Sequence, residues 1–240
     1  MPPASVDRPV VLIPAQNEAS NIAHVVEGFR RLEREGTPLV GEVVVVDSRS
    51  TDHTEEVARR AGATVVREPH GGYGRACLAG LAHLARRPGG PPSIVVFADG
   101  NGSAEPTELF RLIEPIEAGQ ADFVLGSRKR LAAPGSVTFQ QRFGNGLACW
   151  MIRWLHGTRY SDLAPFRAIR WDALQGLEMR DPTYGWSIEM QVKASRKGLR
   201  IHEIDVRTYP RMSGRSKVSG TLRGSIGAGV KIITTVLRYR

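Results

Sequence analysis

Short apolar runs alternate with amphipathic segments along the first half of the chain, and this alternation restricts the possible folds. Five runs, rich in Val and Ile, predict strands at 10–13, 42–46, 63–66, 94–97 and 122–125. The segments between them predict helices at about 17–35, 52–61, 75–87 and 106–118. Alternating strands and helices favour right-handed crossovers, so we expect an α/β fold with a mostly parallel central sheet flanked by helices.

Polar residues follow three of the predicted strands, at 16–18, at 47–49 and at 99–101. The carboxyl ends of parallel strands meet at one edge of a sheet, so these residues are expected to line one cleft. Asp99 and Asn101 offer a carboxylate and an amide oxygen, a pair that can hold Mg2+ or Mn2+ against substrate phosphates. The alternative is an ordinary strand-to-helix turn in which Asp99 or Ser103 serves as a cap.

A glycine-rich loop, Gly71-Gly72-Tyr73-Gly74, precedes the third predicted helix. Glycine lets the backbone approach a ligand closely, and Arg75 would stand near a helix N-terminus, where a phosphate can bind. The spacing matches neither the P-loop pattern nor the G-x-G-x-x-G fingerprint of dinucleotide sites. The expected cleft is compatible with a bound nucleotide, but neither of these two motifs would bind it.

The charge of the chain is divided unevenly between its two halves. Residues 1–127 carry 12 Lys and Arg against 17 Asp and Glu, whereas residues 128–240 carry 21 against 7. After Asp205 there are eight basic residues and no acidic one. This asymmetry indicates a polyanionic partner, and the candidates are phosphates, an anionic membrane surface and nucleic acid. The alternative is a basic face that only keeps the protein soluble. We expect no nucleic acid, because such a partner needs exposed aromatic residues between the cations, and most aromatic residues here fall in helical or motif positions.

Three further observations bear on location. No apolar run approaches the roughly 18 residues that suggest a membrane span. The first eight residues lack a hydrophobic signal region. Cys77 and Cys149 each lie in an apolar helical context, which favours buried free thiols in a reducing compartment. We therefore expect a cytoplasmic protein, either free or peripheral on the cytoplasmic face of a membrane.

The ordered motifs of the chain resemble those of family-two glycosyltransferases. In the first half they are PAQNE (14–18), VDSRSTD (46–52), GGYG (71–74) and DGN (99–101). The second half is similar to the dolichyl-phosphate mannosyltransferase and polyprenyl-phosphate glycosyltransferase branch, through GSR (126–128), DLAPFRA (162–168), YGWSIEM (184–190) and RMSGRSK (211–217). This resemblance covers about residues 10–220. It implies a GT-A fold and inverting transfer of a hexose from a nucleotide-diphosphate sugar to a dolichyl or undecaprenyl phosphate.

The resemblance also implies roles for the residues that match its motifs. The pocket for base and ribose would be lined by Pro14, Ala15, Glu18 and Asp47. The metal that bridges the donor diphosphate would be ligated by Asp99, with Asn101 as the second metal ligand. The acceptor phosphate would meet Arg128, and the diphosphate would be covered by Arg211 and Lys217. Further substrate-binding residues would be Gly74, Arg75, Arg142 and Arg167. Guanidinium groups suit this work because they give forked, charge-assisted hydrogen bonds to phosphate.

The identity of the acceptor decides whether the protein needs a general base. A phosphate acceptor is already an anion near neutral pH, whereas a hydroxyl acceptor needs a carboxylate base. Glu189, on a predicted helix at 187–197, is the best candidate for that base, and its alternative is a structural role.

Two departures from the family pattern concern the metal. Asn101 stands where the family has its second metal-site aspartate, and Ser48 stands where it has the second aspartate of a pair. An amide oxygen still ligates a hard cation but adds no charge, so the metal affinity should be lower.

Two alternative functions stay open. One is the same chemistry on a soluble phosphorylated or saccharide acceptor, and the other is an idle nucleotide-sugar-binding subunit.

The expected organisation is one catalytic domain, residues 1–218, followed by an amphipathic helix at 219–240. The nucleotide-sugar half of that domain would span about residues 8–127 and the acceptor half residues 128–218. The apolar stripe of the terminal helix would consist of Leu222, Ile226, Val230, Ile233 and Leu237. We expect this stripe to lie on an anionic membrane surface or a membrane subunit. Its alternatives are packing against its own domain and the interface of a homodimer.

Overall fold

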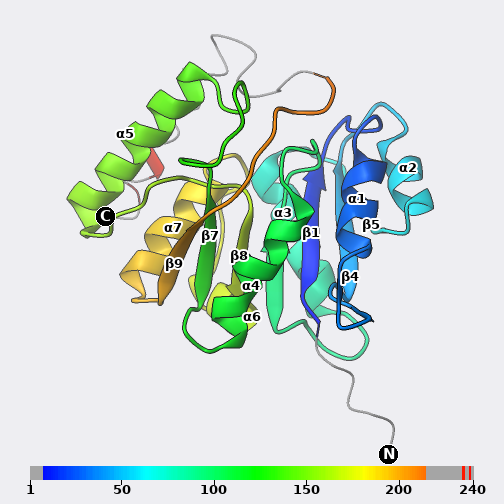
Figure 1. Cartoon of the computed structure of the whole chain (residues 1–240), viewed down its shortest axis with the longest axis horizontal. Helices are drawn as coiled ribbons and strands as arrows, with labels where there is room; N and C mark the ends of the chain where they lie inside the picture. Colours follow the sequence, from blue (N-terminus) through cyan, green and yellow to red (C-terminus); the bar gives the residue numbers. More distant parts are fainter. Residues whose placement is uncertain (1–7, 215–233, 236–237, 239–240) are drawn as a thin grey trace, which may run out of the picture.

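The structure is a computed structural model, and it describes residues 8–214, 234–235 and 238. A seven-stranded sheet runs through its centre in the order β5-β4-β1-β6-β8-β7-β9 (Figure 1). The strands of this sheet are β1 (Val10–Ala15), β4 (Glu42–Ser48), β5 (Thr64–Glu68), β6 (Ile94–Phe97), β7 (Phe123–Ser127), β8 (Arg167–Arg170) and β9 (Ile201–Asp205). A separate small hairpin is formed by β2 (Glu33–Arg34) and β3 (Thr37–Pro38).

The described helices are α1 (Ile22–Arg30), α2 (Thr54–Arg60), α3 (Tyr73–Ala85), α4 (Leu109–Glu117), α5 (Phe139–His156), α6 (Trp171–Leu177) and α7 (Trp186–Arg196). A short 3-10 helix, Pro106–Glu108, leads into α4. Among these helices, none combines the length and the apolar character needed to cross a membrane. The helix expected at 219–240 lies outside the described residues, except for positions 234, 235 and 238.

The sheet is mostly parallel, as the alternation of strands and helices predicts. Neighbouring strands from β5 to β6 all run in the same direction. The exception is β8, which lies between β6 and β7 and is antiparallel to both of them. The strand expected at 122–125 exists as β7, and it pairs with β8 and β9.

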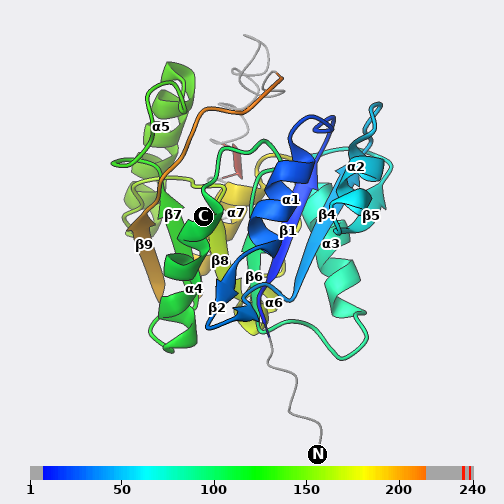
Figure 2. The same ribbon diagram turned by 45° about the vertical axis from the view of Figure 1, so that its right-hand side comes forward.

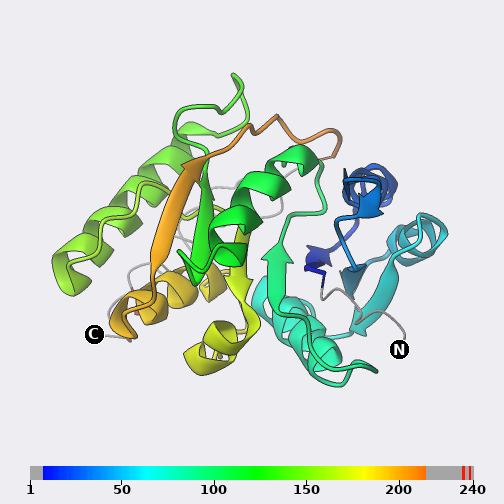
Figure 3. The same cartoon turned by 60° about the horizontal axis from the view of Figure 1, so that its bottom comes forward.

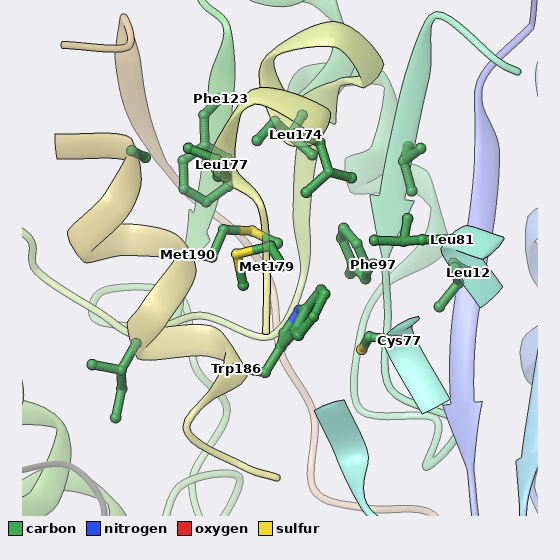
Figure 4. Packing of buried hydrophobic residues seen from close by; sticks show 14 of the residues in the cluster. Leu12, Cys77, Leu81, Phe97, Phe123, Leu174, Leu177, Met179, Trp186 and Met190 are labelled. Atoms are coloured by element: carbon green, nitrogen blue, oxygen red, sulfur yellow. The ribbon is translucent and has the colours of Figure 1, made fainter. Parts of the chain in front are cut away.

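Alternating side chains of the strands build a separate apolar core on each face of the sheet. In β1, Val11 and Ile13 face α1, α2 and α4, whereas Val10 and Leu12 face α3, α6 and α7. Figure 2 shows α1 in front of the sheet, and Figure 3 shows α1 and α4 on the side opposite α3 and α6. Trp186 at the start of α7 is buried against Phe97 and forms the centre of the second core (Figure 4).

Both cysteines lie in this second core as free thiols. Burial raises the pKa of Cys77 well above its usual value and raises that of Cys149 to about 12. Both thiols are therefore protonated at neutral pH. This agrees with the expectation of buried free thiols.

The first helix is shorter than the sequence predicts. It was expected at about 17–35, but α1 spans only Ile22–Arg30 and a hairpin follows it. Asn17 adopts a left-handed conformation, with φ 50°. Its side-chain oxygen accepts from the backbone N of Thr51 at 2.7 Å, and its backbone N donates to the hydroxyl of Ser50 at 2.9 Å. These bonds tie the loop after β1 to the loop after β4.

One ion-pair network lies at the ends of β7, β8 and β9, where Asp122 pairs with Arg170 and Arg200. The pair with Arg200 leads to a stability prediction. Arg200 donates to the Asp122 carboxylate through its backbone N, Nε and Nη2, at 2.7–3.0 Å. These bonds lower the pKa of Asp122 to about 2. Because its pKa is lower in the folded state, this carboxylate stabilises the fold at pH values above its unfolded-state pKa of about 3.9. The stabilisation is lost as the pH falls toward 2.

Asp122→Asn is therefore expected to lower the free energy of unfolding at neutral pH by about 1–2 kcal/mol, after discounting for the exposed half of Arg200. The matched control is Glu27→Gln, which breaks the exposed pair with Arg31 and should cost less than about 0.5 kcal/mol. Urea unfolding at several pH values measures both variants. Equal losses in the two variants, or an unchanged acid dependence in Asp122→Asn, would contradict this account.

Candidate active site

The carboxyl ends of β1 and β4 form the first wall of the site. The parallel register places Ala15 beside Asp47, and both residues are buried. The Asp47 carboxylate accepts from the backbone N of Ser50 at 3.1 Å, which fixes the turn after β4. Glu18 donates its backbone N to the hydroxyl of Thr54, at 2.8 Å. The structure therefore brings Pro14, Ala15, Glu18 and Asp47 to one edge of the sheet, as the sequence predicts.

The next strand, β6, delivers Asp99 to the same edge. Asp99 is half-buried, and no hydrogen bond from the described part of the chain reaches its carboxylate. Burial raises the pKa of Asp99, while the positive charges of Arg128 and Arg167 act in the opposite direction. An ionised carboxylate in this position lacks hydrogen-bond donors and attracts a cation.

Asn101 supplies the second oxygen of a possible metal site. Its Oδ1 accepts from the backbone N of Ser103 at 2.9 Å, which leaves one lone pair for a ligand. The described residues contain no group of three or more His, Cys, Asp and Glu that could hold a metal. Asp99 and Asn101 therefore fit a hard divalent cation that takes its remaining oxygens from a bound phosphate substrate.

On the other side of Asp99, Arg128 is held in a fixed position by Asp162. The Asp162 carboxylate accepts from the backbone N, Nε and Nη2 of Arg128, at 2.7–2.9 Å. Burial alone would raise the pKa of Asp162, but the bonds and charge of Arg128 outweigh it, so the pKa is lowered. The pair is therefore ionised at neutral pH, and it places a guanidinium close enough to affect the charge of Asp99. The pairing was not predicted, although both residues lie in motifs of the resemblance.

Arg167, the first residue of β8, is enclosed by protein. Its side chain is only 1% exposed, and it donates to the carbonyls of Leu163, Ala164 and Ser187. Burial lowers the pKa of its guanidinium, and Asp99 and Asp162 are among the groups that oppose this shift. No carboxylate of the described chain lies within ion-pair distance of it. Arg167 therefore acts on the site through its charge and by holding the turn before β8.

Glu189 on α7 is fully buried, and its contacts are those of a structural group. Its carboxylate accepts from the backbone N of Arg180 and of Asp181, the latter at 2.6 Å. It also forms an ion pair with Lys193 at 2.7 Å. These contacts fix the segment 180–183, so the geometry favours the structural alternative for Glu189 over the role of a base.

The segment 180–183 fills the place where a phosphate was expected at the N-terminus of α3. The carbonyl of Thr183 accepts from the backbone N of Gly74 at 3.1 Å, and that of Pro182 accepts from Arg75 at 3.0 Å. The interpretation of this helix end as a phosphate site is therefore wrong, because protein carbonyls already occupy its first N–H groups. Arg75 itself is exposed and donates to the carbonyl of Gly71.

A strap, residues 209–213, crosses the loops that follow β1 and β6. Arg211 forms a forked pair with the Glu18 carboxylate, at 2.6 and 2.9 Å. Met212 donates its backbone N to the carbonyl of Asn101, and Ser213 donates its hydroxyl to Asn21. The strap therefore lies directly over the expected donor side of the site. Lys217 lies outside the described residues, and Arg142 is exposed on α5.

The sheet, with polar residues gathered at the carboxyl ends of β1, β4 and β6, has the GT-A fold. A crystal structure of glucosyl-3-phosphoglycerate synthase from Mycobacterium tuberculosis, in complex with phosphoglyceric acid, has the same fold, with a TM-score of 0.75. Its sequence is 23% identical, and the match covers 98% of this chain and 80% of that chain.

The chain belongs to glycosyl transferase family 2, whose family model matches residues 10–165. An uncharacterized glycosyltransferase of Mycobacterium tuberculosis is 37% identical over 220 residues, which are 92% of this chain and 94% of that protein. The undecaprenyl-phosphate mannosyltransferase of Micrococcus luteus is 28% identical over 241 residues, covering 95% of this chain and 93% of that protein. The resemblance seen in the motifs is confirmed, and the protein is a glycosyltransferase.

Proposed function

We propose that this glycosyltransferase transfers a hexose from a nucleotide-diphosphate sugar to a polyprenyl phosphate, with inversion at the anomeric carbon. The donor would bind between the ends of β1 and β4, where Pro14, Ala15, Glu18 and Asp47 meet. Arg211, released from Glu18, would move to the diphosphate together with Lys217. The enzyme would work at the cytoplasmic face of a membrane.

A divalent cation, Mg2+ or Mn2+, would be held by Asp99 and Asn101. The half-buried, unbonded carboxylate of Asp99 in the described structure supports this assignment. The synthase that shares the fold has been crystallised with Mn2+ and uridine-diphosphate. When bound, such a cation supplies positive charge that stabilises the departing nucleotide diphosphate.

The single observation that carries the choice of acceptor is the engagement of the carboxylates around the site. In the described structure Glu18 is bonded to Arg211, Asp162 to Arg128, and Glu189 to two backbone amides and Lys193. Asp162 and Glu189 are therefore not free to take a proton from a hydroxyl, Asp99 is assigned to the cation, and Glu18 would be released only when Arg211 moves to the diphosphate. A phosphate monoester needs no base, because it is already an anion at neutral pH.

Arg128 would meet the acceptor phosphate, and the exposed Arg142 would assist it. The pair with Asp162 fixes Arg128 on the acceptor side of Asp99, so that it is preorganised for an anion. The name of the Micrococcus relative, an undecaprenyl-phosphate mannosyltransferase that matches over 93% of its length, supports the same acceptor class.

A second candidate is transfer to a small soluble phosphorylated acceptor. It is favoured by the shared fold of the synthase that was crystallised with phosphoglyceric acid. The two candidates are separated by an activity panel with UDP- and GDP-sugars, Mg2+ or Mn2+, and undecaprenyl phosphate, 3-phosphoglycerate or a saccharide as acceptor. We expect a sugar phosphodiester from undecaprenyl phosphate. Transfer to phosphoglycerate alone would replace the proposal by the second candidate, and donor binding without turnover would indicate an idle binding subunit.

The donor pocket gives a separate prediction. Asp47→Ala removes a buried acceptor at the end of β4, so a bound base or ribose loses its partner. The affinity for the preferred nucleotide, UDP or GDP, is expected to fall about tenfold or more. Calorimetry measures this, with Asp172→Ala on the exposed start of α6 as the control. Unchanged affinity in Asp47→Ala would contradict the assignment of the pocket.

A further inference from the structure

The helix α5 carries a stripe of large aromatic side chains that face solvent. The aromatic stripe consists of Phe139, Phe143, Trp150 and Trp154, which are 80%, 67%, 60% and 71% exposed. Their spacing of four, seven and four residues places them on one face of an α-helix. Trp150 and Trp154 stack with parallel rings whose centroids are 6.2 Å apart. A contiguous exposed apolar patch of this kind marks an interaction surface.

The opposite face of α5 is packed into the protein, so the orientation of the stripe is fixed. Ala148, Cys149, Met151 and Ile152 are buried in the core that also contains α7. Figures 1 and 2 show α5 at the edge of the molecule, and α5 packs against α7. The helix therefore has two apolar faces, and only one of them is needed for the core.

The segment that contains the stripe carries positive charge and no acidic residue, and the nearest exposed acid is Glu203, which accepts from the backbone N of Ser161. Residues 128–161 include six Lys and Arg but no Asp or Glu. Two of these cations, Arg142 and Arg153, are exposed and lie three residues beyond Phe139 and Trp150, which places them beside the stripe. Tryptophan, phenylalanine and arginine on one helix face, without acids, are typical of helices that lie in the headgroup region of anionic membranes.

We propose that α5 is a membrane-docking helix, which inserts the aromatic stripe into the headgroup region of an anionic bilayer. Charge complementarity supports this occupant, because anionic lipid matches the exposed Arg142 and Arg153 beside the stripe. A second copy of the chain would bring an equally cationic face against it, and like charges across an interface are unfavourable. The docking surface stands on the structure alone, whereas its use in delivering the acceptor rests on the proposed function.

The structure connects this surface directly to the acceptor side of the site. On α5, Asn145 donates to the carbonyl of Ser161 and accepts from the backbone N of Leu163, at 2.7 Å. Asp162 lies between these two residues and holds Arg128. A bilayer bound at α5 would therefore present lipid phosphates to the side of the cleft that contains Arg128.

The test is co-sedimentation of the full chain with vesicles of phosphatidylglycerol and phosphatidylcholine in equal parts, and with pure phosphatidylcholine vesicles. We expect binding to the anionic vesicles that weakens with salt. The double variant Trp150→Ser/Trp154→Ser should bind at least about tenfold more weakly, because the buried apolar area sets the strength of insertion. Phe110→Ser, on α4 at the opposite face of the sheet, is the control and should bind as the parent does.

A second readout uses the two tryptophans themselves. Lipids with brominated chains should quench the fluorescence of the parent protein, because Trp150 and Trp154 are exposed, while Trp186 is buried. The proposal is overturned if the parent ignores anionic vesicles or if the double variant binds them equally well. It is also overturned if the double variant only converts a dimer into monomers, since the stripe would then be an interface between copies.

An activity measurement separates this proposal from the proposed function. Transfer to a short-chain, water-soluble polyprenyl phosphate needs no bilayer, so the double variant should retain it. Vesicle binding without any transfer would refute the proposed function and leave the docking surface standing. Transfer to the short-chain phosphate by a protein that ignores vesicles would refute the docking surface alone.

Discussion

Asp99→Asn is expected to abolish glycosyl transfer while leaving the fold intact. The substitution keeps the shape of the side chain but removes the charged group of the pair Asp99 and Asn101. A metal-assisted step owes several kcal/mol to the cation, so the loss should be about a thousandfold or more in kcat/KM. Initial rates with the preferred donor over a series of Mn2+ and Mg2+ concentrations measure it.

The pH dependence and the stability of this variant test the same assignment independently. Burial raises the pKa of Asp99, so metal affinity of the parent should fall as pH is lowered through a range above the usual value of about 4. Because the pKa of Asp99 is raised in the folded state, its ionisation costs stability once the pH has risen through that pKa. At neutral pH, Asp99→Asn should therefore be at least as stable as the parent in thermal unfolding.

Asn101→Asp is the matched gain-of-charge variant. A second carboxylate should tighten Mn2+ binding about tenfold, because a hard cation prefers charged oxygen ligands. Direct titration with Mn2+, followed by its electron paramagnetic resonance signal, measures the affinity without any assay of transfer. Full divalent-dependent activity in Asp99→Asn, or Mn2+ affinity unchanged in both variants, would show that the metal is held elsewhere.

The nucleotide-sugar half could be predicted from the sequence because its signals are local. Its strands are runs of β-branched residues, and the polar residues that follow them are adjacent in the chain. A parallel sheet then brings Asp47 and Asp99 to one edge without any knowledge of side-chain contacts. The expected strands at 10–13, 42–46, 63–66 and 94–97 are confirmed for this reason.

The second half was less predictable because its strands depend on distant partners. The strand β8 reads RAIR and β9 reads IHEID, so neither is a simple apolar run. Arg170 of β8 is bonded to Asp122 at 3.3 Å, and Arg167 donates through both Nη atoms to carbonyls of a neighbouring turn and of α7. These partners appear only after folding, so the sequence gives no sign that such polar segments become strands of the main sheet.

The aromatic stripe on α5 shows a related limit. Periodicity identifies an apolar face of a helix but does not say whether that face is buried. Here Cys149 and Ile152 pack into the core, while Trp150 and Trp154 between and beyond them face solvent. The expected membrane contact was placed at 219–240, outside the described residues, and the structure offers α5 as a surface of the same chemistry.

The phosphate site expected at the N-terminus of α3 was wrong because the segment 180–183, distant in the sequence, packs against this helix end. The close packing at Gly74 leads to a stability prediction. A Cβ built at Gly74 would lie 1.9 Å from the carbonyl oxygen of Asp181 and 2.8 Å from the backbone of Pro182 and Thr183. Those atoms belong to the segment that Glu189 fixes through two backbone hydrogen bonds. The segment therefore has little freedom to move away, and the glycine is needed for close packing.

Gly74→Ala is expected to lower the free energy of unfolding by about 4 kcal/mol, because a methyl group forced against fixed backbone is among the most costly substitutions. The control is Gly176→Ala, at an exposed position of helix α6, where a Cβ would have no neighbour within 4 Å. That change should stabilise the protein by up to about 1 kcal/mol, since Ala favours a helix more than Gly does. Urea unfolding of both variants gives the two values with opposite signs. A small loss in Gly74→Ala together with new phosphate binding at this helix end would mean that the segment 180–183 moves aside, and that the phosphate site exists after all.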